Sequence, residues 1–449
     1  MINKKVAKED FGTDFLWGVS SSALQTEGAH DKDGKGKSIW DVFVTQKKKI
    51  LNNDTHFEAV DFYTHYKTDI ALVKAMGIPN FRFSLSWSRI LPMGTGAVNQ
   101  AGLDFYHEVI DCCLEHGIAP FITLYHWDLP QALETQGGWT NRAILQWFEE
   151  YTKVCITAFK NKVRYWMVLN EPMVFTGGGY FLGIHAPGKK GFNNFIPAMH
   201  HAVLCQAIGY HTIKALAPEA QVGTTYSCSY ITPYSSSPKD KKAAHKVDAL
   251  LNRLFIEPSL GLGYPTDALW FLKKLKKYKH PGDDSLMKVP FDFIGIQNYT
   301  REVIAHSYFT PYIKAKIIPA DKRKVFYTAM DWEVYPEAIY EMIMKFDSYD
   351  GVKKILITEN GASFPDEIID GVIDDHHRSH FLKSYLEEVG RAKRSSAKLA
   401  GYFVWSLTDN FEWAEGFKQR FGLIHIDYTT QKRTVKNSGW WYKTFLEEQ

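Results

Sequence analysis

The sequence predicts an α/β fold, a single (β/α)8 TIM barrel with long loops after its strands. Eight short apolar runs recur along the 449 residues, each with the length and the β-branched and aromatic content of a buried parallel strand. Helical patterns lie between them, and no low-complexity tract or Pro/Ser-rich linker divides the chain. We therefore expect one domain over residues 1–449. The alternation by itself also allows a doubly wound sheet.

The expected strands, in chain order, are Phe15–Val19, Asn80–Leu85, Ala119–Tyr125, Val163–Leu169, Gln221–Tyr226, Phe291–Gln297, Lys354–Thr358 and Gly401–Ser406. The connecting helices are recognised by a different period. Between the third and fourth strands, for example, Ile144, Phe148, Tyr151, Cys155 and Ala158 recur every three to four residues. This spacing predicts a helix over Asn141–Phe159, capped by Thr140 or Asn141.

Composition and charge exclude several classes of protein. The formal charge is only +3, and the lysine clusters are separate and lack interleaved aromatic residues, so we expect no nucleic-acid partner. Residues 1–10 are polar, and no run reaches the roughly 18 apolar residues of a membrane span, which favours a cytoplasmic protein without a membrane partner. The 13 Trp and 24 Tyr either fill a core or line a sugar-stacking cleft.

Neither the cysteines nor the histidines indicate a metal or a cofactor. The five cysteines are odd in number, lie in mostly apolar settings and have no metal-ligand spacing, which favours buried reduced thiols. His376 and His380 are at i,i+4 in the run 374–380, a spacing that can bind a metal. The acidic residues before them are more typical of the start of a helix, and we expect no metal there.

Two acid-bearing segments carry the chemistry. Glu171 follows the fourth expected strand in the segment VLNEP (168–172), and Glu359 follows the seventh in ITENG (357–361). Pro172 favours an extended backbone at Glu171, and Asn360-Gly361 indicates a turn. In a barrel the carboxyl ends of all strands meet at one mouth. The two glutamates can therefore come together for acid/base or nucleophilic catalysis.

The chain resembles glycoside hydrolase family 1, the β-glucosidase family, from about Phe11 to the C-terminus. The motifs that carry the resemblance are FLWG (15–18) with QTEG (25–28), FRFSLSWSRI (81–90), LYHWDLP (124–130), the two acid segments, and WSLTDNFEW (405–413). The resemblance implies the barrel fold and a retaining β-glycosidase, whose two carboxyls should lie about 5–5.5 Å apart.

The resemblance also implies the role of each catalytic residue. Glu171 is expected to be the general acid/base and Glu359 the nucleophile, with Arg82 and the Tyr299 hydroxyl favouring the Glu359 anion. The environments of the two carboxyls must then push their pKa values apart.

The same match implies the sugar-binding residues. Gln25, His126, Asn170, Glu412 and Trp413 are expected to bind hydroxyl groups, Trp405 to stack under the ring, Trp332 to hold the leaving group, and Phe421 to line the site. A non-proline cis peptide is expected near Trp405-Ser406. The segment GIQNY (295–299) departs from the commoner family pattern, which has Asn then Tyr before the final Tyr, and we retain Gln297 as a substrate contact, with Asn298 a weaker candidate.

The expected substrate is a small β-glucoside or a short oligosaccharide, and β-galactosides and β-fucosides are open alternatives. A 6-phospho-β-glycosidase of the same family would be expected to carry Ser, Lys and Tyr at positions 412, 419 and 421, where this chain has Glu412, Gln419 and Phe421. A noncatalytic sugar-binding relative would be expected to lack one of the two glutamates. The sequence leaves the oligomeric state and the natural leaving group open.

Overall fold

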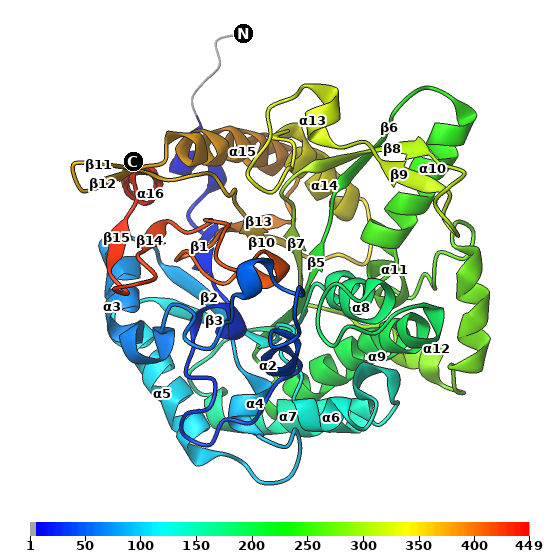
Figure 1. Cartoon of the computed structure of the whole chain (residues 1–449), viewed down its shortest axis with the longest axis horizontal. Helices are drawn as coiled ribbons and strands as arrows, with labels where there is room; N and C mark the ends of the chain where they lie inside the picture. The colour runs from blue at the N-terminus through cyan, green and yellow to red at the C-terminus, as the bar shows by residue number, and fades with distance from the viewer. Residues whose placement is uncertain (1–5, 449) are drawn as a thin grey trace.

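Eight parallel strands close into a barrel at the centre of the computed structural model, which describes residues 6–448 (Figure 1). The strands are β1 (Leu16–Ser20), β2 (Asn80–Ser84), β3 (Ala119–Tyr125), β4 (Tyr165–Asn170), β5 (Gln221–Ser227), β7 (Phe293–Gln297), β10 (Ile355–Asn360) and β13 (Leu399–Trp405). Going round the barrel, their order is β1-β13-β10-β7-β5-β4-β3-β2. All eight predicted strands are confirmed, and the closure excludes the doubly wound alternative.

The longer helices surround the barrel (Figure 1). They are α3 (Phe62–Ala75), α5 (Gln100–Glu115), α7 (Ile144–Phe159), α9 (Phe192–Leu216), α10 (Pro238–Asp248), α14 (Glu337–Asp347), α15 (His376–Ser395) and α16 (Asn437–Glu447). The helix predicted from Asn141 begins later, at Ile144, because the Asn141 side chain accepts a hydrogen bond from the Ala143 N–H ahead of the helix. The histidine run does open a helix, α15, as expected.

Short elements form most of the long loops. The short helices are α1 (Ala23–Thr26), α2 (Ile39–Phe43), α4 (Trp87–Ile90), α6 (Gln131–Glu134), α8 (Pro172–Gly177), α11 (Ile256–Ser259), α12 (Asp283–Leu286) and α13 (Ala320–Arg323). The short strands are β6 (Tyr230–Pro233), β8 (Arg301–His306), β9 (Ala315–Ile317), β11 (Glu367–Ile369), β12 (Val372–Asp374), β14 (Ile424–Ile426) and β15 (Arg433–Val435). β6, β8 and β9 pair into a small sheet, which Figure 1 shows beside α10.

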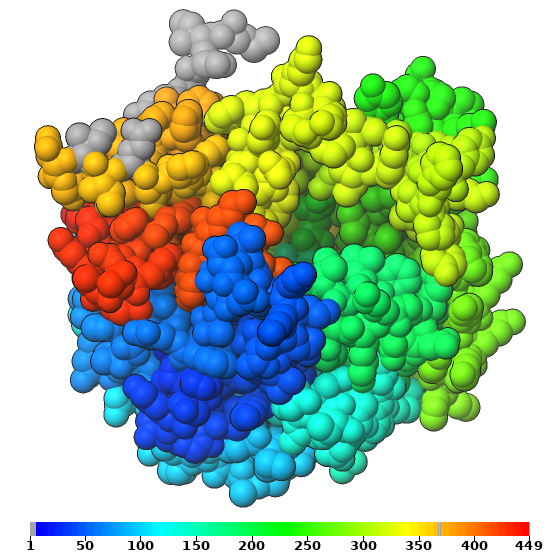
Figure 2. Space-filling model, in the orientation of Figure 1, coloured from blue at the N-terminus to red at the C-terminus, as the bar shows by residue number. Residues whose placement is uncertain are grey.

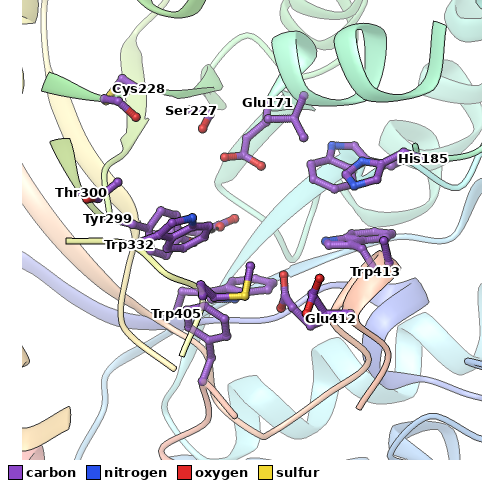
Figure 3. Close-up of a pocket in the computed structure, with 18 of the residues that line it drawn as sticks. Glu171, His185, Ser227, Cys228, Tyr299, Thr300, Trp332, Trp405, Glu412 and Trp413 are labelled. Carbon is purple, nitrogen blue, oxygen red and sulfur yellow. Dashed lines mark hydrogen bonds between the residues drawn. The ribbon is translucent and has the colours of Figure 1, made fainter. Parts of the chain in front are cut away.

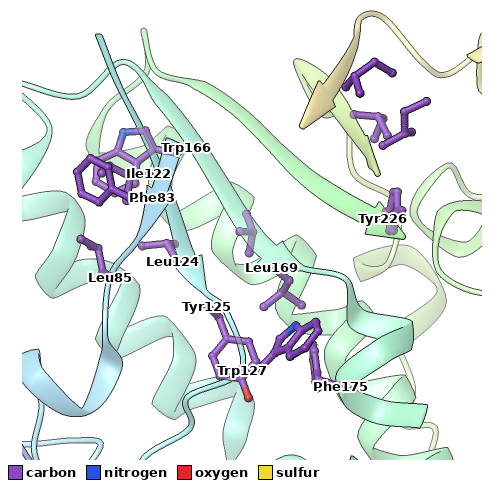
Figure 4. Packing of buried hydrophobic residues seen from close by; sticks show 14 of the residues in the cluster. Phe83, Leu85, Ile122, Leu124, Tyr125, Trp127, Trp166, Leu169, Phe175 and Tyr226 are labelled. Atoms are coloured by element: carbon purple, nitrogen blue, oxygen red, sulfur yellow. The ribbon is translucent and has the colours of Figure 1, made fainter. Parts of the chain in front are cut away.

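Two apolar layers hold the barrel together. The inner layer is a plug of buried side chains from five strands, namely Phe121, Met167, Phe293, Leu356 and Phe403. The outer layer lies between the strands and the helices, and Figure 4 shows part of it around β2, β3 and β4. Burying a large apolar side chain contributes about 1.5–3 kcal/mol, so apolar burial in these two layers makes a large favourable contribution to the free energy of folding.

Three tryptophans and the five cysteines lie outside the plug and are buried. Trp17, Trp87 and Trp166 belong to the outer layer, and all five cysteines are free and buried. Among the described residues, we find no helix whose length and apolar character would let it cross a membrane.

Polar side chains occupy the barrel at the carboxyl ends of the strands, above the plug. Strand pairing places Asn170 of β4 beside Thr225 of β5, and Gln297 of β7 beside Glu359 of β10. Arg82 of β2 forms the floor of this layer, because its Nε contacts both Thr123 Oγ1 and the sulfur of Met167 in the plug. The register of the barrel therefore gathers polar groups from strands far apart in the sequence.

Candidate active site

A cavity of about 390 Å³ opens at the carboxyl ends of the strands. Figure 2 shows its entrance as a hollow among the blue, green, yellow and orange segments of the surface. Nine of the residues singled out in the sequence line it: His126, Glu171, Tyr299, Trp332, Glu359, Trp405, Glu412, Trp413 and Phe421. The other four, Gln25, Arg82, Asn170 and Gln297, lie directly behind this lining and bind its members. The barrel thus brings all thirteen residues to one site.

Three donors converge on the carboxylate of Glu359. Arg82 Nη1 lies 2.5 Å and Gln297 Nε2 lies 2.7 Å from Oε1, and the Tyr299 hydroxyl donates to Oε2 at 2.7 Å. Arg82 and Glu359 are both buried, so this is an ion pair out of water. Burial raises the pKa of Glu359 above its usual value, and the charge of Arg82 and the hydrogen bonds from Arg82 and Tyr299 oppose this rise. These contacts favour the ionised form of Glu359.

Asn170 links this carboxylate to His126. Its Oδ1 accepts hydrogen bonds from Arg82, Gln297 and Thr225, so its only donor group, Nδ2, points to His126 Nε2 at 3.0 Å. Burial and the nearby Arg82 charge lower the pKa of His126 well below its usual value, so its ring is neutral. With Nε2 accepting, the proton lies on Nδ1, which has no hydrogen-bond partner within residues 6–448. His126, which lines the cavity, therefore has a buried donor without a partner among the described residues.

Glu171 does not have the extended backbone that Pro172 led us to expect. Its φ and ψ are 45° and 64°, in the left-handed region, where it caps the start of α8 with Pro172 as the first helical residue. Its N–H donates to the Thr225 carbonyl at 3.0 Å. This bond to the neighbouring strand overrides the local preference, and the side chain points into the cavity (Figure 3).

The environment of Glu171 favours its protonated form. Burial, followed by the negative charge of Glu359, raises its pKa well above the usual value, and a hydrogen bond from Ser227 opposes this rise only in part. Among the described residues, no lysine or arginine forms an ion pair with Glu171, in contrast to Glu359. The site therefore holds two buried acids, of which only Glu359 has a cationic partner that favours its ionised form, and an acid catalyst beside an anionic nucleophile requires such a difference.

One side of the cavity presents the carboxyl of Glu412 and the rings of Trp413, Trp127 and His126. Glu412 accepts a hydrogen bond of 3.4 Å from Gln25 Nε2, and burial together with the Glu359 charge raises its pKa to about 8. The ring of Trp413 lies 4.3 Å from that of Trp127 and 5.7 Å from that of His126. Trp405 forms the floor (Figure 3).

The floor of the cavity contains the expected cis peptide, which is confirmed between Trp405 and Ser406. Gly361, two residues after Glu359, allows the end of β10 to approach this peptide closely, because a Cβ at position 361 would overlap the Trp405 carbonyl.

The opposite side is an aromatic wall. The ring of Trp332 lies 5.3 Å from that of Tyr299 and 6.1 Å from that of Phe421. Figure 3 shows Thr300, Tyr299 and Trp332 across the cavity from Glu412 and Trp413. The Thr300 hydroxyl donates to the Glu333 carbonyl at 2.8 Å, which attaches the chain after Tyr299 to the loop that carries Trp332.

The two unusual residues before Tyr299 have different positions. Gln297 is part of the hydrogen-bond network around Glu359, since its amide bridges Glu359 and Asn170 at 2.7 and 2.8 Å. Asn298 is not part of the cavity lining, and it donates instead to the carbonyls of Cys228 and Thr300. The longer side chain of Gln297 thus places an amide directly on the carboxylate, and its contact with a substrate stays a prediction.

Several lining residues escaped the sequence analysis. They include His185, Ser227, Cys228, Thr300, Glu302, Met330 and Glu415. All except Thr300 lie in loops or at strand ends without a recognisable motif. Thr300 directly follows Tyr299, and this adjacency is the one signal that could have identified it.

A second group of possible metal ligands lies outside this cavity. Asp366, Asp409 and His425 have ligand atoms within 4.8 Å of one another. Lys436 Nζ lies 2.9 Å from Asp366 and 2.7 Å from Asp409, and Arg420 also binds Asp409 at 2.7 Å. Buried cationic side chains already neutralise these carboxylates, so the group is an ion-pair network.

Comparisons with known proteins agree over nearly the whole chain. Residues 7–449 match the family model described as Glycosyl hydrolase family 1. The chain is 41% identical over 447 residues to "Beta-glucosidase A" of Acetivibrio thermocellus, covering 98% of this chain and 99% of that protein. It is 34% identical to "6-phospho-beta-glucosidase GmuD" of Bacillus subtilis, covering 97% of each. A structure of the β-glucosidase from Thermotoga maritima in complex with glucoimidazole superimposes with a TM-score of 0.93 at 39% identity, over 97% of this chain and 98% of that one.

Proposed function

Because this chain belongs to glycosyl hydrolase family 1, we propose that it is a retaining β-glycosidase that hydrolyses terminal, unphosphorylated β-D-glucosides. Glu359 is the nucleophile and Glu171 the general acid/base. One observation carries the proposal. Two buried carboxyls line one cavity, and only Glu359 is paired with an arginine, whereas burial and the Glu359 charge raise the pKa of Glu171.

In the first half of the reaction, Glu359 attacks the anomeric carbon while the bond to the leaving oxygen breaks. Glu171 gives its proton to that oxygen, so the leaving group departs as a neutral alcohol. We assign Asn170 Nδ2 and the His126 Nδ1–H as the donors to sugar hydroxyls, and Trp405 as the ring that stacks under the sugar.

In the second half, a water molecule replaces the leaving group. The glycosyl ester of Glu359 carries no negative charge, so one of the two main causes of the raised pKa of Glu171 has gone. Glu171 can then take a proton from the water as it attacks the anomeric carbon. The bond to Glu359 breaks, and the sugar is released with its original β configuration.

The charges of the cavity favour an unphosphorylated sugar. Its lining contains Glu171, Glu302, Glu359, Glu412 and Glu415 but, among the residues described, no lysine or arginine. Gln419, at the position where the phosphate-binding relatives are expected to carry lysine, is held by Ser363, Ala329 and Glu415 outside the lining. A phosphate dianion would have no cation to bind here.

A substrate comparison tests this function. We expect 4-nitrophenyl β-D-glucoside to have a kcat/KM at least about 10²-fold higher than its 6-phosphate, since burying a phosphate dianion without a cationic partner costs several kcal/mol. Matched β-galactoside, β-fucoside and cello-oligosaccharide substrates would define the sugar and the chain length accepted. A preference for the 6-phosphate would reject the proposed substrate class, and an α-configured first product would reject the retaining mechanism.

A second prediction concerns Tyr299. The Tyr299→Phe variant removes one of the three donors to Glu359, and we expect a loss of about 10²-fold in kcat/KM. Because the Glu359 anion is then less stable, its pKa rises, and the acid limb of the pH profile should move to higher pH. The measurement is the pH dependence of kcat/KM.

Tyr66→Phe is the matched control, because it removes a tyrosine hydrogen bond of the same 2.7 Å length to a carboxylate, Glu108, away from the cavity. We expect this control to leave the pH profile unchanged. An acid limb that stays in place in Tyr299→Phe would contradict the role assigned to this hydroxyl.

A further inference from the structure

The side of the cavity beyond Trp332 contains a carboxyl that the catalytic mechanism does not use. Glu302 lies on β8, two residues after Thr300, and both residues line the cavity, as alternate residues of an extended chain can. Thr300 and Trp332 lie across the cavity from Glu412 and Trp413 (Figure 3). Glu302 therefore belongs to the side where the leaving group would lie.

The charge of Glu302 is not neutralised by the protein. The charge of Arg323 acts on it, but Arg323 and Arg301 both form ion pairs with Glu333, at 2.5 and 2.8 Å. Within the described residues, the carboxyl of Glu302 forms no hydrogen bond and no ion pair of its own, although the side chain is more than half buried. A half-buried carboxyl without a partner leaves a negative potential in the cavity.

The other four lining carboxyls have different positions. Glu171 and Glu359 are the catalytic pair, and Glu415 directly follows the segment that carries Glu412 and Trp413, and accepts a hydrogen bond from Gln419. Of the five carboxyls, Glu302 alone comes from the small sheet next to the Trp332 loop. It is thus the charge that a leaving group stacked on Trp332 would meet.

We propose that Glu302 selects leaving groups by charge, so that this enzyme prefers aglycones bearing an ammonium group over those bearing a carboxylate or phosphate. The inference rests on the proposed function, because it concerns the leaving group of the same substrate. Trp332 strengthens the preference, since an aromatic face also attracts cations.

The test compares three phenyl β-D-glucosides that differ only at the para position: aminomethyl (cationic), methyl (neutral) and carboxymethyl (anionic). The quantity of interest is the ratio of kcat/KM for the cationic and anionic substrates. Because both share one glucosyl group, changes in the catalytic pair cancel in this ratio. We expect a ratio of about 10 or more in the unmodified enzyme at pH 7.5, as a partly screened charge pair contributes up to about fivefold for each substrate, in opposite directions.

The variants assign the effect to one residue. Glu302→Gln should bring the ratio to within about threefold of one, and Glu302→Lys should invert it. The matched control is Glu337→Gln, which removes an exposed carboxylate on α14 outside the cavity and should leave the ratio unchanged. A ratio near one in the unmodified enzyme, or a ratio that persists in both Glu302 variants, would overturn the inference. Absence of turnover of the neutral substrate would instead reject the proposed function.

The ratio should also depend on pH. Burial raises the pKa of Glu302 to about 7, the Arg323 charge opposes this rise, and Glu333, neutralised by Arg301 and Arg323, adds to it. The ionised form therefore accumulates as the pH rises through 7, and the ratio should increase over that interval. In Glu302→Gln the increase near pH 7 should disappear. An unchanged pH dependence in this variant would likewise contradict the assignment.

Discussion

Replacing Glu359 by alanine is expected to abolish the hydrolysis of every glycoside, with a loss of about 10⁵-fold or more in kcat. Of the carboxyls that line the cavity, Glu359 alone accepts hydrogen bonds from Arg82 and Tyr299, which hold an anion in place to form the covalent intermediate. Steady-state rates on 4-nitrophenyl β-D-glucoside would measure the loss. Near-normal turnover by this variant would reject Glu359 as the nucleophile.

The same variant permits a sharper experiment with an added nucleophile. Alanine leaves space beside Arg82, and a small anion such as azide can enter it and attack the anomeric carbon of an activated substrate. Since only one displacement then occurs, the product should be the α-glucosyl azide, with inverted configuration. Glu359→Gln is the matched control, because its amide fills the space and should prevent rescue. A β-glucosyl azide from Glu359→Ala would contradict the assigned direction of attack.

Replacing Glu171 by alanine is expected to divide substrates by their leaving groups. Alkyl glucosides need a proton on the departing oxygen, and their kcat/KM should fall by about 10³- to 10⁴-fold. A glucoside of an acidic phenol such as 2,4-dinitrophenol needs little protonation, so its kcat/KM should fall by less than about tenfold. Equal losses on both classes would show that Glu171 is not the acid.

The pH profile of kcat/KM gives a second measure of Glu171. Burial and the Glu359 charge raise its pKa, so the protonated, active form is present below that pKa and is lost as the pH rises through it. Glu359 must be ionised, so activity is lost on the acid side as the pH falls through its own pKa. In Glu171→Ala the descending alkaline limb should disappear while the acid limb remains. An alkaline limb that persists would assign that limb to another group.

Much of the fold could be predicted from local sequence. Strands such as β3 are apolar runs of the right length, and its predicted bounds, Ala119–Tyr125, are those observed. The ends of elements were less predictable, because they depend on single hydrogen bonds. β10 extends through Asn360 because its pairing with β13 continues to Val404, so Glu359 lies inside the strand instead of after it.

The candidate site, too, could be predicted from the sequence only in part. The resemblance to a known family identified the residues, but not what each of them touches. Gln297 was expected to contact the substrate, and its closest contacts in the structure are Glu359 and Asn170. Glu302 had no sequence signal, because a single glutamate in a short strand is ordinary. Glu302 has no ion-pair partner because the two nearby arginines, Arg301 and Arg323, bind Glu333.

The sequence by itself determined the barrel and the family, since strand periodicity and ordered motifs are properties of short segments. It also indicated that Glu171 and Glu359 would meet at one mouth. Only the tertiary structure decided how they differ. Arg82 from β2 forms an ion pair with Glu359, whereas burial and the charge of Glu359 raise the pKa of Glu171. Proton affinity depends on charges and dipoles within a few ångströms, and these come from strands that are distant in the chain.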